Sequence, residues 1–133
     1  MFINYKIIKN VLNRKRNFGV LNKNPQKKGI VLQTRIVTPK KPNSARRPVA
    51  KLSLVNKKQT IAHIPGIGHN LRKHSNLLIR GGGARDLPGV SYTAIRGVYD
   101  LSGVLNRFRR RSIYGIAIPE NKKKKLRRKF RQN

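Results

Sequence analysis

The chain has 133 residues, of which 33 are Lys or Arg and only 3 are Asp or Glu, so its formal charge at pH 7 is +30. This length suits a single domain with extensions. Self-repulsion at such a charge opposes compaction unless a polyanion neutralises it, so we expect nucleic acid as the partner. The apolar runs fall short of the roughly 18 residues that span a bilayer, and no membrane contact is expected. The chain has no Cys, which excludes disulfides and cysteine-based zinc sites.

Residues 1–28 are expected to form a basic N-terminal helix followed by an extended arm. Ile7, Ile8, Val11 and Leu12 recur at helical spacing in a stretch without acidic residues. One interpretation is an organelle transit peptide. The other is an amphipathic helix that docks on the body or on a neighbour, which we prefer because the stretch contains no Ser.

Residues 29–104 are expected to form the folded domain, because short stretches of β-branched or alternating apolar residues are bounded there by Gly and Pro. In the second stretch, Ala50, Leu52 and Leu54 fall on one face of the predicted strand. Five such stretches predict a small all-β barrel, either a five-stranded oligonucleotide-binding (OB) barrel or an SH3-like barrel. The expected strands are 29–37, 48–55, 60–64, 76–80 and 91–98, with a hairpin turn at 56–58.

Residues 105–133 are expected to form a basic C-terminal extension. Its last part, residues 122–131, has eight basic residues in ten. Such a block repels itself until phosphates neutralise it, and we predict that it contacts RNA rather than serving only as a solvated surface.

The inventory of side chains argues against an enzyme. General acid-base or two-metal chemistry needs clustered carboxylates, and no two of the three acidic residues form a recognisable pair. The three histidines have no acid at ligand spacing beside them, so we expect structural or RNA-contacting histidines rather than metal ligands. No catalytic residue, metal or cofactor is expected. The acidic residues are Asp86, Asp100 and Glu120, and the histidines are His63, His69 and His74.

Segment 38–47 is the most informative on physical grounds. Pro39 and Pro42 stiffen it, its four cations offer phosphate contacts, and Asn43 and Ser44 offer short polar groups for sugar hydroxyls or base edges. We interpret it as a loop that recognises the shape of RNA. A solvated loop is the alternative.

A second element of this kind lies at 85–89. Pro88 and Gly89 fix a turn there, and we expect Arg85 and Asp86 to project from it as a charged pair. Cations elsewhere in the chain are expected to contact the RNA backbone. They are Lys27, Lys28, Arg46, Arg47, Arg80, Arg96, Arg107, Arg109, Arg110, Arg111, Lys122, Lys123, Lys124, Lys125, Arg127, Arg128, Lys129 and Arg131.

Several long motifs occur in fixed order between residues 24 and 115. They are NPQKKG, TPKKPNSA, GHNL with HS shortly after it, LIRGG, DLPGV, and an RG that precedes RSxYG. Together they closely resemble the universal small-subunit ribosomal protein S-twelve family. The resemblance implies an OB barrel with an N-terminal arm, seated at the decoding centre of the small ribosomal subunit. The implied partners are small-subunit rRNA, mRNA and tRNA paired at the decoding site, and neighbouring ribosomal proteins, with no homo-oligomer.

The same resemblance implies that two loops face the place where codon and anticodon pair. Asp86 would occupy the position that bacterial members of the family can carry methylthiolated. The loop residues concerned are Lys40, Lys41, Pro42, Asn43, Ser44, Arg85, Asp86, Leu87 and Pro88.

The sequence also departs from the family pattern. Arg46-Arg47-Pro48 stands where Leu-Arg-Lys is usual, Arg85 replaces a usual Lys, and Arg72-Lys73 replace a usual Gln-Glu. Enrichment in Asn, Lys and Ile suggests an AT-rich genome, which favours a mitochondrial ribosome over a plastid or bacterial one.

The leading hypothesis is therefore a structural constituent of the small subunit that supports accurate decoding of mRNA. The runner-up is a free RNA chaperone or translation factor on the same barrel, which would stack bases on aromatic side chains. Aromatic residues make up only 6% of the chain, which counts against that alternative.

Overall fold

The structure is a computed structural model that describes residues 19–120. The expected N-terminal helix and the basic block at 122–131 lie outside the described residues. Within residues 19–120 there is no helix long and apolar enough to cross a membrane.

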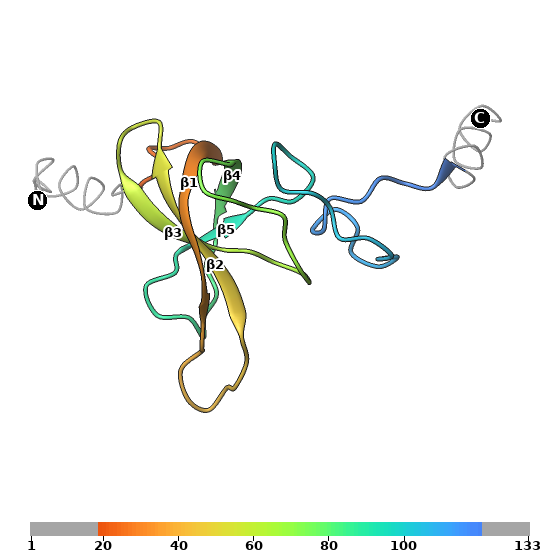
Figure 1. Ribbon diagram of the computed structural model, residues 1–133, viewed down its shortest axis with the longest axis horizontal. Helices are drawn as coiled ribbons and strands as arrows, with labels where there is room; N and C mark the ends of the chain where they lie inside the picture. Colours follow the sequence, from red (N-terminus) through yellow and green to blue (C-terminus); the bar gives the residue numbers. More distant parts are fainter. Residues whose placement is uncertain (1–18, 121–133) are drawn as a thin grey trace, which may run out of the picture.

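Five strands form a closed barrel in the order β1-β2-β3-β5-β4 (Figure 1). All neighbouring strands pair antiparallel except β3 and β5, which pair parallel. This closed five-stranded order confirms the expected OB barrel. The strands are β1 Gln26–Val37, β2 Arg47–Leu54, β3 Gln59–His63, β4 Asn76–Gly81 and β5 Tyr92–Ala94.

The long strand β1 closes the barrel because it pairs with two neighbours. Its residues from Gly29 onward pair with β2, and its residues Gln26 to Ile30 pair with β4. The register with β2 shifts between Val31 and Gln33, as at a β-bulge, which bends a strand and increases its twist. β1 therefore pairs with β2 on one side and with β4 on the other, and the sheet has no free edge at this strand.

The core confirms the alternation predicted for the second strand. Ala50, Leu52 and Leu54 are all buried and point into the barrel. Burying a leucine-sized side chain contributes about 1.5 to 3 kcal/mol, so the barrel is the main source of stability in the described chain. The other members of the core cluster are Val31, Ala62, Ile64, Leu71, Leu77, Ile79, Ala94 and Leu101.

The predicted turn at 56–58 is confirmed. The amide of Leu54 donates to the carbonyl of Lys58 at 3.0 Å, and the amide of Lys57 donates to the carbonyl of Leu54 at 2.8 Å. Lys57 has a φ of 60°. The turn therefore joins β2 to β3 as a hairpin.

The last strand is shorter than predicted. The sequence pattern indicated residues 91–98, but β5 ends at Ala94. Gly97 has a φ of 77°, a backbone conformation that ends regular pairing, and Arg96 turns into the interior.

Arg96 corrects one sequence prediction, because it was expected to contact the RNA backbone. Its side chain is 3% exposed and donates hydrogen bonds to the carbonyls of Pro65, Gly68 and Ser102. The guanidinium is thus occupied within the protein. Arg96 is a structural residue that joins the chain after β5 to the chain after β3.

Beyond β5 the described chain continues without a strand to Glu120 and extends away from the barrel (Figure 1). Close backbone contacts between glycines hold this segment together. A Cβ on Gly103 would lie 2.5 Å from the carbonyl oxygen of Gly115, and a Cβ on Gly115 would lie 2.6 Å from the backbone of Arg96. Only glycine permits these approaches.

Candidate nucleic-acid interface

The two loops that were expected to face the decoding site lie next to each other. We call them the paired loops, residues 38–46 and 84–90. The amide of Lys40 donates a hydrogen bond to the carbonyl of Asp86 at 3.0 Å. The structure therefore brings together two elements that are far apart in the sequence.

An ion pair joins the same two regions. The guanidinium of Arg47, at the start of β2, lies 2.6 Å from the carboxylate of Asp86, and the Asp86 side chain is only 14% exposed. Arg85 and Asp86 were expected to project together from the turn at 85–89. The geometry corrects that prediction for Asp86, because its side chain is turned toward Arg47, whereas Arg85 is exposed. A carboxylate with so little access to water depends on this partner, since removing one member of a buried pair leaves an uncompensated charge.

A small cluster of buried apolar residues packs beneath the surface of the paired loops. Val49, Leu87 and Val90 are buried, and Val37 and Ala84 pack against them. Leu87 was expected among the residues at the RNA surface, but its side chain is 3% exposed. It therefore holds the loop in position and does not offer its side chain to a ligand.

The remaining side chains of the paired loops point outward. Loop 38–46 exposes two cations, a proline and two short polar groups in succession, which are Lys40, Lys41, Pro42, Asn43 and Ser44. Arg46, Arg85 and Pro88 are exposed as well. Such a surface can contact phosphates through its cations and sugar or base edges through its polar groups.

His63 on β3 lies close to the ion pair. Burial lowers the pKa of the His63 imidazole below its usual value, and the charge of Arg47 lowers it further, whereas the backbone of Pro48 and the carboxylate of Asp86 raise it. Its Nδ1 is buried and has no hydrogen-bond partner among the described residues. The ring is therefore neutral at pH 7, and it adds no charge to the Arg47–Asp86 pair.

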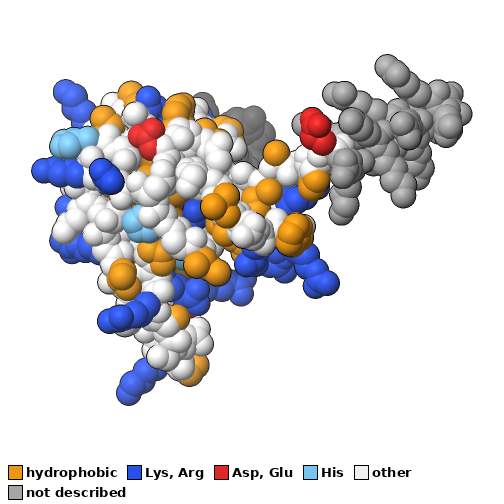
Figure 2. Space-filling view, turned by 45° about the vertical axis from the view of Figure 1, so that its right-hand side comes forward, with side chains coloured by type: hydrophobic (Ala, Val, Ile, Leu, Met, Phe, Trp, Pro, Cys, Tyr) orange, Lys and Arg blue, Asp and Glu red, His pale blue; other side chains and the backbone are white. Residues whose placement is uncertain are grey.

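The other expected phosphate contacts are distributed over different parts of the chain. Lys27 and Lys28 lie on β1 and Arg80 lies on β4, where the two strands pair. The ammonium of Lys28 is 5.0 Å from the centre of the Tyr99 ring. Figure 2 shows Lys and Arg side chains distributed around the face of the molecule that it displays, with few acidic ones between them. A ligand that touched all of them would have to surround the barrel, as a folded RNA can.

Arg107, Arg109, Arg110 and Arg111 lie in the segment after the barrel and not with the paired loops. Arg109 and Arg110 are exposed, whereas Arg107 and Arg111 are partly buried. The site residues predicted from the sequence therefore form at least two separate basic surfaces.

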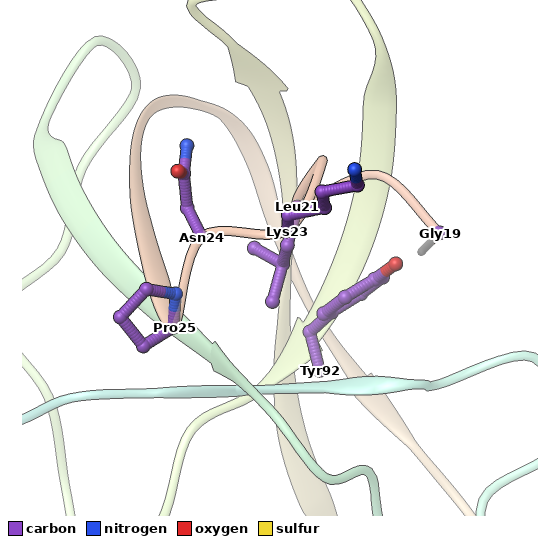
Figure 3. A pocket seen from close by; sticks show the side chains of 6 residues that line it. All are labelled: Gly19, Leu21, Lys23, Asn24, Pro25 and Tyr92. Atoms are coloured by element: carbon purple, nitrogen blue, oxygen red, sulfur yellow. The ribbon is translucent and has the colours of Figure 1, made fainter. Parts of the chain in front are cut away.

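An open cavity with mostly apolar walls lies where the described chain enters the barrel (Figure 3). Its walls come from the first described residues and from the ring of Tyr92 on β5. The amide of Val20 donates to the Tyr92 hydroxyl at 2.8 Å, and the Asn56 side chain donates to the carbonyl of Val20 at 3.1 Å. These bonds anchor the arm on the barrel, and sequence analysis did not identify Tyr92 in this role. The lining residues are Gly19, Leu21, Lys23, Asn24, Pro25 and Tyr92.

No group of three metal-binding side chains comes together in the part of the chain that the structure describes. The surface is thus one of cations, short polar groups and a stiff backbone. That chemistry suits the binding of a structured polyanion.

Comparison with known proteins identifies the family that the chain resembles. The family model described as "Ribosomal protein S12/S23" matches residues 13–130. The "Small ribosomal subunit protein uS12m" of Paramecium tetraurelia is 63% identical over 125 residues, which cover 93% of this chain and 90% of that protein. The family match spans the barrel, the paired loops and the segment after the barrel.

Proposed function

The chain belongs to the ribosomal protein S12/S23 family, and from this membership we propose that its paired loops support accurate decoding of mRNA. It is a structural constituent of the small ribosomal subunit, in the mitochondrial ribosome, with rRNA and ribosomal proteins as its partners. In this proposal, the exposed residues of the paired loops contact the RNA at the codon–anticodon pair and the rRNA around it.

The observation that carries this proposal is the coupling of the two loops. The Lys40–Asp86 hydrogen bond, the Arg47–Asp86 ion pair and the shared apolar cluster make one surface from two loops. A surface held in this way can favour one arrangement of the neighbouring RNA over another. Only a difference in contact between two states changes which state is populated.

Lys41 is the sharpest test of that surface, because it is exposed between the two prolines of loop 38–46. A hydrogen bond between a cation and a phosphate contributes about 1.5 to 3 kcal/mol. If the contact favours the closed arrangement of the decoding centre, its loss changes acceptance of near-cognate tRNA about tenfold. The change is expected toward fewer errors and slower elongation.

The experiment compares Lys41→Ala with Lys58→Ala in purified ribosomes that carry each variant. Lys58 is also an exposed lysine, in the β2–β3 turn, and unlike Lys57 it does not occupy a left-handed conformation. The ratio of near-cognate to cognate incorporation is measured, and subunit yield is checked by sedimentation. The proposal requires a changed ratio for Lys41→Ala alone. Equal ratios for both variants, at normal yield, would show that the loop serves only as scaffold.

A further inference from the structure

The segment after the barrel contains a closed loop that the proposed function does not use. We call it the C-terminal loop, residues 105–114. Its ends are joined, because the amide of Val104 donates to the carbonyl of Tyr114 at 3.0 Å. Gly103 and Gly115 lie in backbone contact beside this bond. Surface loops whose ends meet in this way are compact and commonly functional.

Contacts inside the C-terminal loop give it a defined shape. The Arg107 guanidinium lies 4.3 Å from the centre of the Tyr114 ring and donates to its hydroxyl at 3.3 Å. The amide of Ile113 donates to the carbonyl of Arg110, and the amides of Tyr114 and Ile116 donate to the carbonyl of Arg111. Arg107 is thus turned inward, and the loop does not need a ligand to keep its conformation.

The outer side of the loop displays two large apolar side chains. Leu105 is 88% exposed and Phe108 is 84% exposed, the two highest values among large apolar side chains of the described residues. Two such residues on one ordered loop differ from the scattered apolar residues of an ordinary surface. They indicate a contact that this chain does not make with itself.

The charge around Phe108 identifies the kind of partner. Arg109 and Arg110 follow it and are exposed, and the sequence has no acidic residue between Asp100 and Glu120. A protein partner that covered Phe108 with an apolar pocket would also have to desolvate or neutralise these cations. An RNA strand supplies phosphates for the arginines and a flat base for the ring at the same time.

We propose that Phe108 stacks on an unpaired base of small-subunit rRNA while Arg109 and Arg110 bind the adjoining phosphates. The base is unpaired because bases inside an RNA helix are already stacked on each other, and side chains reach the faces of bases mainly in loops and bulges. The choice of rRNA rests on the proposed function, since it assumes that the chain resides in the small subunit. The stacking itself does not depend on the decoding role, because the C-terminal loop and the loop between β1 and β2 extend from different sides of the barrel (Figure 1).

The first experiment measures binding of the full-length chain to a single-stranded RNA of about 12 nucleotides and to a duplex of the same length. Phe108→Leu keeps an apolar side chain and removes the aromatic face, and it should weaken single-strand binding about tenfold. Phe108→Trp should keep the affinity. Val55→Ala is the matched control, because Val55 is 77% exposed but lies outside the C-terminal loop.

Salt dependence separates stacking from charge. Phe108→Leu should leave the slope of log affinity against log salt unchanged. Arg109→Gln with Arg110→Gln should reduce that slope by roughly 0.7 for each phosphate of a single strand that the arginines no longer neutralise. An affinity of Phe108→Leu equal to that of the unsubstituted chain overturns the proposal. An equal loss of affinity for the single strand and the duplex also overturns it, because duplex bases offer no free face.

The second experiment uses small subunits stripped of mRNA and tRNA. Phe108→Leu chains should be released from these subunits at a lower salt concentration than unsubstituted chains. In complete ribosomes that carry Phe108→Leu, the misreading ratio should stay unchanged. Release at the same salt concentration would overturn the assignment to rRNA. Failure of the decoding proposal would appear instead in Lys41→Ala, so the two failures can be told apart.

Discussion

The paired loops and the segment after the barrel, residues 95–120, are both basic and both lie outside the barrel, yet they are fixed by different interactions. One ion pair, one backbone hydrogen bond and a small apolar cluster hold the paired loops. A buried guanidinium and close glycine contacts hold the segment after the barrel. Changing one charge of the ion pair can therefore alter the support of the paired loops without disturbing the barrel. The contacts that hold the segment after the barrel are continuous with the packing of the barrel.

The largest expected effect follows from removing the buried guanidinium. Arg96→Leu leaves the carbonyls of Pro65, Gly68 and Ser102 without their donors. Hydrogen bonds made by a charged group contribute about 1.5 to 3 kcal/mol each, so the loss of three of them should lower the free energy of unfolding by about 3 kcal/mol or more. Urea titration of the full-length chain, followed by tyrosine fluorescence because the chain has no Trp, measures this change.

Arg96→Lys is the matched variant. A lysine keeps the charge but lacks the planar fork of donors that binds three acceptors. The free energy of unfolding of Arg96→Lys should therefore lie between those of the unsubstituted chain and Arg96→Leu. An unchanged urea midpoint for Arg96→Leu would show that the segment after the barrel is not anchored through this residue. The contrast between the two regions would then disappear.

A smaller effect is expected from the histidine beside the ion pair. Because burial holds the pKa of His63 below its usual value of 6.5, the unfolded chain takes up a proton at a higher pH than the folded chain. The stability contributed by the neutral ring is therefore complete above about pH 6.5 and is lost as the pH falls through the folded pKa. Urea midpoints at about pH 7.5 and about pH 5 should differ for the unsubstituted chain, within the range where histidine titrates.

His63→Phe keeps a ring at this position and removes the titration. Its urea midpoint should change less between the two pH values than that of the unsubstituted chain. An identical pH dependence in both proteins would assign the effect to groups other than His63. The support of the paired loops would then be insensitive to the charge of His63.

The sequence predicted the barrel well where burial and alternation coincide. Ala50, Leu52 and Leu54 carried that signal, and the turn at 56–58 lies where it was expected. The first strand begins earlier than predicted for a physical reason. Residues Gln26 to Lys28 have no apolar alternation, and they are extended because they pair with β4. Such pairing is a tertiary contact that a local pattern does not contain.

Only the local features of the candidate site could be predicted, because its tertiary contacts are not contained in a local sequence pattern either. The rigid, basic character of loop 38–46 follows from its residues, but its ion pair with the second loop depends on the barrel that brings Arg47 to Asp86. From the sequence, Asp86 was expected to project outward with Arg85. The structural role of Arg96 could not be predicted from the sequence, because the three carbonyls that accept its hydrogen bonds come from separate parts of the chain.

Two loops that act on decoding as one unit should be energetically coupled, and a double-mutant cycle measures that coupling. Lys41→Ala, Asp86→Asn and the double variant are compared in purified ribosomes by the ratio of near-cognate to cognate incorporation. Asp86→Asn keeps the shape of the side chain and removes the ion pair with Arg47. Coupled residues have effects that do not add, with interaction energies of about 0.5 to 3 kcal/mol, so the double variant should differ from the product of the single effects by more than about twofold. If the effect of the double variant on this ratio equals the product of the single effects, the two loops act independently and do not form one functional surface.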